Sequence, residues 1–551
     1  MSTQAAADRR SAEVVIVGFG PVGQTLAALL GHQGHDVVVL ERQTSMYDKP
    51  RAVTLDNEVT RILAAIGLSS CFEEFCLPSW QYDWQNAEGE TLIHFEFGTE
   101  PGSNRPINVT FHQPSLEARL IELVSRLASV EVRRGATVVD LVETDTEVVV
   151  GYETATGERL EVAARYVVGC DGANSRVREA LGTEIEDRGF FYDWAVLDVL
   201  PHDRERLESW EPRNLQICDP ARPTTVVSAG PGRRRWEFFV LPDEDPQIFE
   251  DDAYAWQLLK PWDLTPENAD MERAAVYRFR AMCCKTWRRG RLLVAGDAAH
   301  LMPPFIGQGL CSGVRDAANV AWKLDAVLRG AASPDLLDTY TSERRAHVQH
   351  AIGMSVELGK VICIADPEAA AARDAHMLAA GGHPERALPA VPPPALGPGI
   401  TRRRPDGSPM GPAGQFAGHG LVRLPDGRVG PHDDLVLPAF ALGARFDARE
   451  HLTEESVEAF LRLGGVFEHF VAGGPGSEVE LRQEVGYRQV EDVGGYYLPH
   501  MTERGFSAAI VRPDYHLFGV CKDADDVQGL VDDLLGQVGH SVSPGAGAAA
   551  S

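Results

Sequence analysis

A glycine-rich turn between a buried strand and a helix is the feature that most constrains this fold. Residues 14–18 (VVIVG) predict a short buried strand, residues 21–31 a helix, and residues 37–40 (VVVL) a second buried strand. Strand, turn, helix and strand follow one another within about thirty residues, the size of a parallel βαβ unit. The chain is therefore predicted to contain a parallel sheet whose strands are connected through helices.

The turn carries three spaced glycines, in the sequence Gly18-Phe19-Gly20-Pro21-Val22-Gly23. Gly18 permits the tight turn, Gly20 lets the backbone approach a pyrophosphate, and Gly23 allows the helix and strand to pack closely. The helix N-terminus offers free N–H groups to the phosphates. Glu41 ends the second strand, where its carboxylate can accept hydrogen bonds from ribose hydroxyls and disfavours a 2′-phosphate. The unit predicts a dinucleotide site, and NAD and FAD are both open at this point.

Composition limits the classes of function. A length of 551 residues predicts about two to four domains, and 44% apolar residues are enough to build their cores. The formal net charge of −28 disfavours nucleic acid and anionic membranes as partners. The nine cysteines form no CxxC pair, which predicts reduced thiols in a cytoplasm and no metal site. Because no run of 18 apolar residues occurs, no transmembrane helix is expected.

Two later motifs favour a flavin. Asp171-Gly172 follows a strand-like YVVG, and Asp297 follows a strand-like LLVAG. An aspartate at the carboxyl end of a strand can bond a hydroxyl of the ribityl chain. Gly307 and Gly309 let backbone N–H groups meet the pyrimidine edge of the flavin. The helix predicted at 310–329 directs its N-terminus to that edge, where its dipole stabilises an anionic reduced flavin.

These motifs, in this order and at these spacings, resemble those of the flavoprotein aromatic hydroxylases, the class A single-component FAD monooxygenases. The chain is most similar to the branch that contains 3-(3-hydroxyphenyl)propionate hydroxylases and phenol hydroxylase-like enzymes. The similarity covers residues 12–365, and residues 411–540 more loosely resemble a thioredoxin-like C-terminal domain found in some members. It is carried by the segments VVIVGFGPVG, KPRAVTLDNE, CDGANSRVR, CDPARP, RRWEFFVLP, RLLVAGDAAHLMPPFIGQG and DAANVAWKL.

The resemblance implies an α/β fold in which a Rossmann-like FAD-binding domain is interleaved with a β-rich substrate domain and followed by a thioredoxin-like domain. The expected boundaries are 12–80, 105–190 and 275–365 for the FAD-binding domain, 81–104 and 191–274 for the substrate domain, 366–410 for a linker, and 411–540 for the C-terminal domain. The linker is expected from its Ala-rich and Pro-rich composition. Because the last domain has only Cys521, it is expected to serve as a scaffold or a homodimer contact and not in dithiol exchange.

The resemblance also implies which residues hold FAD, namely those of the three motifs and a few near them. They are Gly18, Gly20, Pro21, Val22, Gly23, Glu41, Arg42, Arg51, Gln113, Val138, Asp171, Gly296, Asp297, Pro304, Gly307, Gly309, Leu310 and Cys311. Cys311 departs from the family, which usually has asparagine there. Because a thiol is a weak donor and acceptor, backbone N–H groups are expected to serve the flavin at this point.

The implied reaction inserts one oxygen atom of O₂ into a phenolic ring. NADH or NADPH reduces FAD, the reduced flavin adds O₂ at C4a, and the ring attacks the resulting hydroperoxide, so the cofactor carries the chemistry. The protein positions the ring and excludes water. The expected substrate is a 3-hydroxyphenylpropionate-like or related small phenol, in the catabolism of aromatic compounds.

Three alternatives stay open at this point. The enzyme could tailor an aromatic polyketide or another bulky phenol. It could be a flavoprotein dehydrogenase or oxidase that inserts no oxygen. It could also be a binding or redox-sensing protein with a degenerate FAD site.

Fewer residues point to the substrate. Asp56 could accept a phenolic proton or could cap a helix, and the two interpretations are equally open. The basic run 233–235 is expected to be a solvated turn. Four residues of the β-rich segment are either substrate contacts or packed sheet residues: Trp194, Gln216, Cys218 and Phe238.

Overall fold

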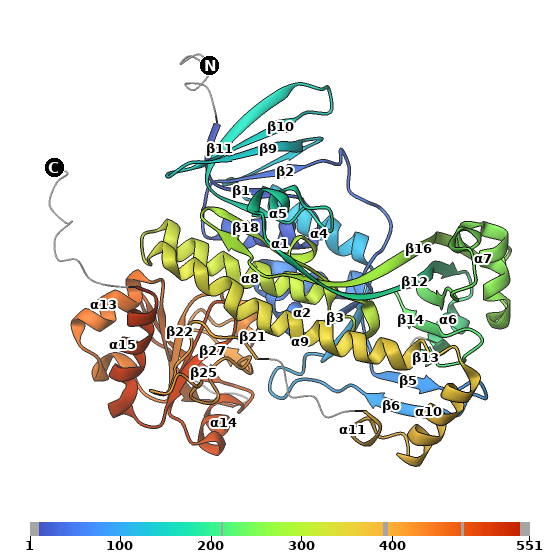
Figure 1. Cartoon of the computed structure of the whole chain (residues 1–551). Helices are drawn as coiled ribbons and strands as arrows, with labels where there is room; N and C mark the ends of the chain where they lie inside the picture. The colour runs from blue at the N-terminus through green and yellow to red at the C-terminus, as the bar shows by residue number, and fades with distance from the viewer. Residues whose placement is uncertain (1–9, 211–212, 389–394, 475–478, 540–551) are drawn as a thin grey trace.

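The chain folds into three parts, which are seen in a computed structural model that describes residues 10–210, 213–388, 395–474 and 479–539. Each part is built around its own large sheet. In Figure 1 the first sheet lies at the top, the second at the right and the third at the lower left. The first two parts are interleaved along the chain, as the sequence predicts.

The first sheet contains the predicted βαβ unit. Its strands run in the order β17-β18-β11-β1-β2-β8, with β10 and β9 added beside β11. β1 pairs in parallel with β2 and β11, and α1 (Pro21–His32) connects β1 to β2. The strands are β1 (Arg10–Val17), β2 (Val37–Glu41), β8 (Val130–Arg134), β9 (Thr137–Glu143), β10 (Val148–Glu153), β11 (Arg159–Gly169), β17 (Arg288–Arg289) and β18 (Leu292–Val294). The apolar runs of β1 and β2 are buried because helices cover this sheet.

The second sheet is mainly antiparallel and is the predicted β-rich part. Its order is β19-β16-β12-β15-β14-β13-β5-β6. Two long strands, β12 (Ile185–Pro201) and β16 (Ala269–Cys284), pair with each other and connect this sheet to the first part. The other strands are β5 (Gln81–Gln85), β6 (Thr91–Glu96), β13 (Arg213–Ile217), β14 (Thr224–Ser228), β15 (Arg234–Phe239) and β19 (His300–Leu301). A separate small sheet has the strand order β3-β7-β4. Its strands are β3 (Thr54–Asp56), β7 (Asn108–Phe111) and β4 (Cys76–Pro78).

Helices fill the space around these two sheets. α8 (Gly309–Leu328) is buried along almost its whole length and packs against α1. The remaining helices are α2 (Asn57–Leu63), α3 (Phe72–Phe75), α4 (Gln113–Ser125), α5 (Arg176–Leu181), α6 (Arg204–Trp210), α7 (Asp252–Leu259) and α9 (Thr339–Ile362). Both long helices predicted from the sequence, near 115–128 and 310–329, are confirmed with small shifts of their ends.

The segment 366–410, expected to be a linker, contains regular structure. Asp366 caps α10 (Pro367–Ala379), with its side chain accepting a hydrogen bond from the Ala369 amide, and α11 (Pro384–Ala387) follows. Met377 is buried in the apolar cluster of the second sheet, so this segment packs as part of that domain. Its Ala-rich composition indicates a helix as well as a flexible connection.

The third sheet forms the C-terminal part. Its order is β21-β20-β25-β23-β22-β26-β27, with β24 beside β25. The strands are β20 (Leu421–Arg423), β21 (Val429–Pro431), β22 (Ala441–Ala444), β23 (Val466–Ala472), β24 (Gln483–Glu484), β25 (Tyr487–Asp492), β26 (Ala508–Val511) and β27 (Leu517–Cys521). The helices are α12 (His432–Leu435), α13 (Glu454–Arg462), α14 (Tyr497–Arg504) and α15 (Val527–Gln537). The α/β character is confirmed, and the thioredoxin-like assignment stays a prediction.

Buried charges join the C-terminal part to the first part. Arg512 donates hydrogen bonds to both Glu343 oxygens, at 3.0 and 2.8 Å, and the same carboxylate accepts one from Lys323 at 2.8 Å. The side chains of Arg512, Glu343 and Lys323 are 0% exposed. Asn319 of α8 donates to Asp514 at 2.8 Å. The helix that reaches the predicted flavin edge is therefore held in place from its far side by the C-terminal part.

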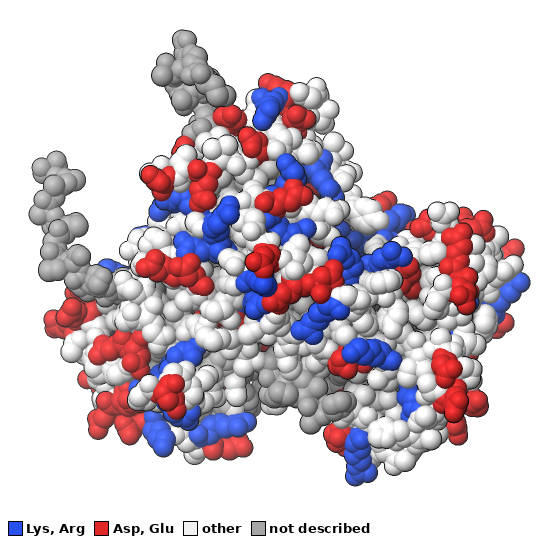
Figure 2. Space-filling model, viewed as in Figure 1, with Lys and Arg blue, Asp and Glu red and all other residues white. Residues whose placement is uncertain are grey.

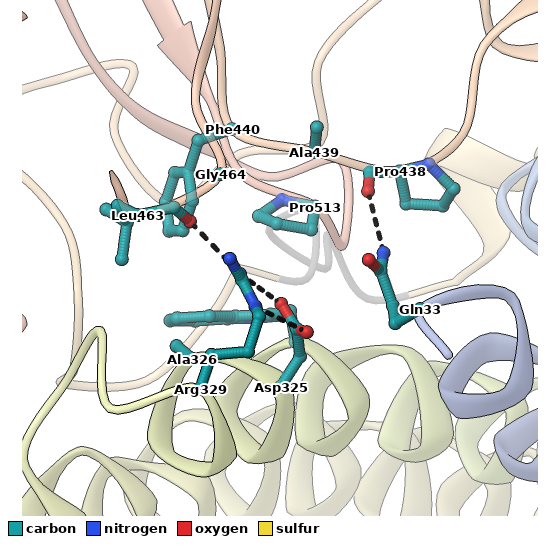
Figure 3. A pocket seen from close by; sticks show the side chains of 11 residues that line it. Gln33, Asp325, Ala326, Arg329, Pro438, Ala439, Phe440, Leu463, Gly464 and Pro513 are labelled. Carbon is teal, nitrogen blue, oxygen red and sulfur yellow. Dashed lines mark hydrogen bonds and ion pairs between the residues drawn. The ribbon is translucent and has the colours of Figure 1, made fainter. Parts of the chain in front are cut away.

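A pocket of about 140 Å³ lies at the same boundary (Figure 3). Figure 3 shows Arg329, which directly follows α8, between Asp325 and the Leu463 carbonyl, and Gln33 directed at the Pro438 carbonyl. The residues that line this pocket include none of the predicted FAD site residues. It is a gap between docked domains and is separate from the predicted site.

The visible surface carries mixed charge. Figure 2 shows acidic and basic side chains interspersed over most of the viewed face, with acidic ones gathered near α7 and near α13 and α15. Within the described ranges, no single helix has the length and apolar composition to cross a membrane, although the bent pair 334–362 and 367–379 meets both criteria.

The buried ion cluster makes a testable prediction. Arg512→Met leaves the Glu343 and Asp514 carboxylates buried beside a single lysine, which should cost about 3–5 kcal/mol of stability. We expect a clearly lower midpoint of urea unfolding. Arg462→Met is the control, because Arg462 forms an exposed pair with Glu458 at 3.4 Å and should change stability little. Equal losses in the two variants would contradict this account.

Candidate functional site

The first glycine motif meets the Asp-Gly motif at the carboxyl ends of adjacent strands. β1 and β11 end side by side, with Val17 opposite Gly169, and a Cβ atom at Gly18 would lie 2.4 Å from the Cys170 carbonyl oxygen. A Cβ at Gly23 would lie 2.2 Å from the Gly18 carbonyl oxygen. Both glycines are therefore required by the packing of the turn. A Cβ at Gly20, in contrast, would meet no atom within 4 Å, so the chain leaves open space there.

Glu41 lies at the end of β2, next to this turn. Its carboxylate accepts hydrogen bonds from the Phe19 and Gln43 amides, each at 2.7 Å. These bonds fix the carboxylate beside the N-terminus of α1. The arrangement fits a ribose that lies next to a pyrophosphate.

The third motif packs directly on the first. Gly296 has a φ of +61°, and a Cβ there would lie 3.0 Å from the side chain of Val22. A Cβ at Gly313 of α8 would lie 2.6 Å from the same side chain. The Gly296 amide donates to Asp316 at 3.0 Å, which holds the turn against α8. Segments nearly three hundred residues apart in the chain therefore form one wall.

Asp297 and Arg51 lie on the same side of this wall. The Asp297 side chain is exposed, although protein surrounds it closely enough that desolvation raises its pKa. The charges of His300 and Arg51 act on the same carboxyl and oppose this increase in pKa. Asp297 is therefore accessible at a position that protein closely surrounds, which fits a residue that binds a ribityl hydroxyl.

The N-terminus of α8 is open towards the same region. Gln308 precedes the helix, and no side chain caps its first N–H groups. Gly307 has a φ of +65°, and a Cβ there would lie 3.3 Å from Thr54. Cys311 is buried, and its thiol is directed at the Thr54 carbonyl oxygen at 3.8 Å. The thiol is thus used in packing, and the role of the neighbouring backbone N–H groups towards a flavin stays a prediction.

Several predicted cofactor residues are held by protein contacts. Gln113 accepts hydrogen bonds from the Arg51 and Ala52 amides, at 3.2 and 2.7 Å, and so fixes that segment. Asp171 accepts from the Arg176 amide at 2.7 Å, while its other oxygen is buried without a partner. Val138 is buried in β9. The others border the turns already described or are exposed: Pro21, Pro304, Gly309, Leu310 and Arg42.

Asp56 takes the helix-capping role that the sequence left open. One oxygen accepts a hydrogen bond from the Val59 amide at 3.0 Å, and the other accepts from Gln308 at 2.9 Å and Arg315 at 2.5 Å. Burial opposes the ionisation of Asp56, but the three donors outweigh it and lower its pKa. Asp56 therefore links α2 to the turn before α8. A role in accepting a substrate proton is not supported by these contacts.

The predicted substrate residues divide between the two faces of the second sheet. Trp194 and Cys218 belong to one apolar cluster, and the Trp194 ring lies 5.8 Å from Phe305 in the turn that follows Pro304. Phe238 lies on the opposite face, where its ring packs against Trp262 at 6.1 Å. Phe238 is thus separated from the others, because successive residues of a strand point to opposite faces. Phe305 is a candidate that the sequence analysis missed.

The basic run 233–235 is not a solvated turn. Arg235 is 2% exposed and donates to both oxygens of Asp198, at 2.7 and 2.9 Å. It also donates to the Arg51 carbonyl at 2.6 Å. Arg273 reaches the Pro50 carbonyl. The second sheet therefore holds the segment that contains Arg51. The burial of Arg235 could not be predicted from nearby residues, because its partner Asp198 lies on another strand.

Together these contacts form a site that fits FAD. The open space at Gly20, the fixed Glu41 carboxylate, the exposed Asp297 and the uncapped helix α8 match the pyrophosphate, ribose, ribityl and pyrimidine parts of that cofactor. All of them come from segments that the sequence analysis named.

Comparison with known proteins agrees with this geometry. Residues 11–355 match the family model described as FAD binding domain, and residues 414–537 match that of the HcaD C-terminal domain. A probable NADH-specific resorcinol 4-hydroxylase of Rhodococcus jostii is 37% identical, over 97% of this chain and 96% of its own. A 3-(3-hydroxy-phenyl)propionate/3-hydroxycinnamic acid hydroxylase of Mycolicibacterium gilvum is 37% identical, over 68% of this chain and 65% of its own.

Solved structures share the fold. The flavin-dependent monooxygenase PieE, in complex with FAD and substrate, has a TM-score of 0.76 at 21% identity and covers 96% of this chain and 99% of its own. Aklavinone-11 hydroxylase with FAD and aklavinone has a TM-score of 0.71 at 22% identity, covering 96% of this chain and 100% of its own. The chain belongs to the FAD-binding-domain family of flavoprotein aromatic hydroxylases.

Proposed function

We propose that this protein is an FAD-dependent monooxygenase that consumes NADH and hydroxylates a small phenol. The observation that carries the proposal is the convergence of three distant segments, around Gly18, Asp171 and Asp297, at the carboxyl ends of three adjacent strands. Ligands bind at this edge of open parallel sheets. The relative that matches almost the whole chain is named as NADH-specific, which supports NADH as the donor.

The residues of the chain have separate tasks in this proposal. The turn at Gly20 and the N-terminus of α1 bind the pyrophosphate, Glu41 the ribose, Asp297 the ribityl chain, and the first N–H groups of α8 the pyrimidine edge. FAD held there would supply the redox chemistry by which NADH and O₂ give one oxygen atom to the phenol and one molecule of water. The aromatic cluster around Trp194 holds the ring and excludes water.

A single-ring phenol is favoured over a bulky one. The full-length match to a resorcinol 4-hydroxylase supports a single-ring substrate, and the solved hydroxylase with bound aklavinone is only 22% identical. We further propose a cytoplasmic enzyme, because all nine cysteines are free and most are buried. Self-association as a homodimer stays a prediction.

Gly20→Ala tests the cofactor site. Because a Cβ at Gly20 meets no protein atom, the variant should fold normally but bind FAD about tenfold or more weakly, since the methyl group occupies space that the pyrophosphate needs. The measurement is a titration of apoprotein with FAD, with circular dichroism to verify the fold. Gly536→Ala in α15, also without a nearby atom, is the control. Unchanged FAD affinity in Gly20→Ala would remove this turn from the site.

Turnover tests the reaction. Resorcinol should accelerate NADH oxidation by the FAD-loaded enzyme, and the product should be heavier by one oxygen atom. A matched reaction without phenol sets the background. If NADH oxidation yields only hydrogen peroxide with every phenol tested, the protein is an oxidase and the proposal fails.

A further inference from the structure

The inner face of the second sheet carries a carboxylate that the proposed chemistry has not yet used. We define this inner face by Trp194, Val196 and Asp198 of β12 and by Arg235, Glu237 and Phe239 of β15. Trp194 contacts Phe305 beside the flavin-facing turn, and Arg235 bonds the segment of Arg51. In the strand, Glu237 lies between Arg235 and Phe239, and it pairs with Val196 across the sheet. Glu237 therefore lies on the face directed at the FAD-binding part.

Glu237 belongs to a polar row that crosses the sheet. Thr225 pairs with Glu237, and Gln216 pairs with Thr225, so the three side chains share one face. The Gln216 amide oxygen accepts hydrogen bonds from Thr225 at 2.6 Å and from Tyr82 at 3.3 Å, and its nitrogen donates to a backbone carbonyl. Gln216 is thus satisfied by the protein. Glu237, in contrast, has one long contact among the described residues, with Arg235 at 3.5 Å.

The carboxylate of Glu237 differs from those of Asp193, Glu244 and Glu272, which are closely paired with arginines. It is 12% exposed, and its nearest cation is Arg235 at 3.5 Å, a guanidinium already engaged by Asp198. Among the described residues, Arg235 is the one that contributes a hydrogen bond to this carboxylate, over this long distance. Glu244, Glu272 and Asp193 each accept hydrogen bonds from an arginine at 3.2 Å or less.

A largely buried carboxylate with one long contact keeps acceptor sites to which a ligand can donate a hydrogen bond. Burial raises the pKa of Glu237, and Asp198 adds to this increase while Arg235 opposes it. Glu237 in turn contributes to the raised pKa of Tyr82 on β5. The local electrostatics therefore disfavour any further negative charge and favour a neutral hydroxyl donor.

We propose that Glu237 is a substrate-binding residue that accepts a hydrogen bond from a hydroxyl group of an uncharged dihydroxybenzene and disfavours phenols that carry a carboxylate. The proposal rests on the proposed function and specifies its substrate class. A phenol with an acidic side chain would bring a second carboxylate next to Glu237 in a space with little water, where like charges repel strongly. A site built to bond a hydroxyl also discriminates against a ring that lacks it.

The test compares equilibrium binding by FAD-loaded wild type, Glu237→Gln and Glu272→Gln. The flavin absorbance change measures Kd for resorcinol, phenol and 3-(3-hydroxyphenyl)propionate. In Glu237→Gln we expect the Kd of resorcinol to rise about tenfold or more, because a bond to a charged acceptor is replaced by a neutral one. The Kd of the propionate should fall. Glu272→Gln, in the same sheet but paired with Arg233, should match wild type within twofold.

A resorcinol Kd within twofold of wild type in a folded, FAD-loaded Glu237→Gln would overturn the inference. If Glu237→Gln does not retain FAD, the Kd values of the wild type provide the test. The wild type should bind resorcinol at least tenfold more tightly than phenol or the propionate. Equal affinities would again overturn it. These outcomes are separate from the proposed function, which fails only if the wild type adds oxygen to none of the three compounds.

Discussion

Close backbone contact at the carboxyl ends of β1, β11 and β18 is the constraint on which the site depends. A Cβ atom at Gly18 or Gly23 would overlap a carbonyl oxygen, and one at Gly296 would press on Val22. The absence of side chains lets three strands end almost in contact. At these turns no atom lies within 4 Å of a Cβ at Gly20, the Glu41 carboxylate is fixed, and Asp297 is exposed. A dinucleotide can reach backbone N–H groups only because nothing else fills the space at Gly20.

The second constraint is the attachment of the second sheet to the segment that contains Arg51. The buried pair of Arg235 and Asp198 holds the carbonyl of Arg51, while Gln113 holds the amide of the same residue. The segment is thus fixed from both domains. Such a double attachment would keep a bound flavin and phenol in a fixed relative position, which a hydroxylase requires. From the opposite side, the buried cluster of Arg512 and Glu343 holds α8 and α9.

Local patterns were enough to predict the first sheet, because a parallel strand buried on both faces and a glycine turn are encoded in neighbouring residues. The strand and turn structure around Gly18 and Asp297 could therefore be predicted from the sequence, while the roles of these residues towards FAD stay predictions. Residues of the second sheet could not be assigned to a face, because both of its faces are packed and hydrophobic alternation is lost. Phe238 was placed with Trp194 for this reason. Arg235 looked like part of a solvated turn because its partner Asp198 lies on another strand.

The central claim is that this site inserts an oxygen atom of O₂ into a phenol, and isotopic labelling tests it most directly. The FAD-loaded enzyme would be supplied with NADH and resorcinol under ¹⁸O₂, and the product analysed by mass spectrometry. The account predicts one ¹⁸O atom in each molecule of hydroxylated product. A product without ¹⁸O, or unchanged resorcinol while NADH is consumed, would contradict it.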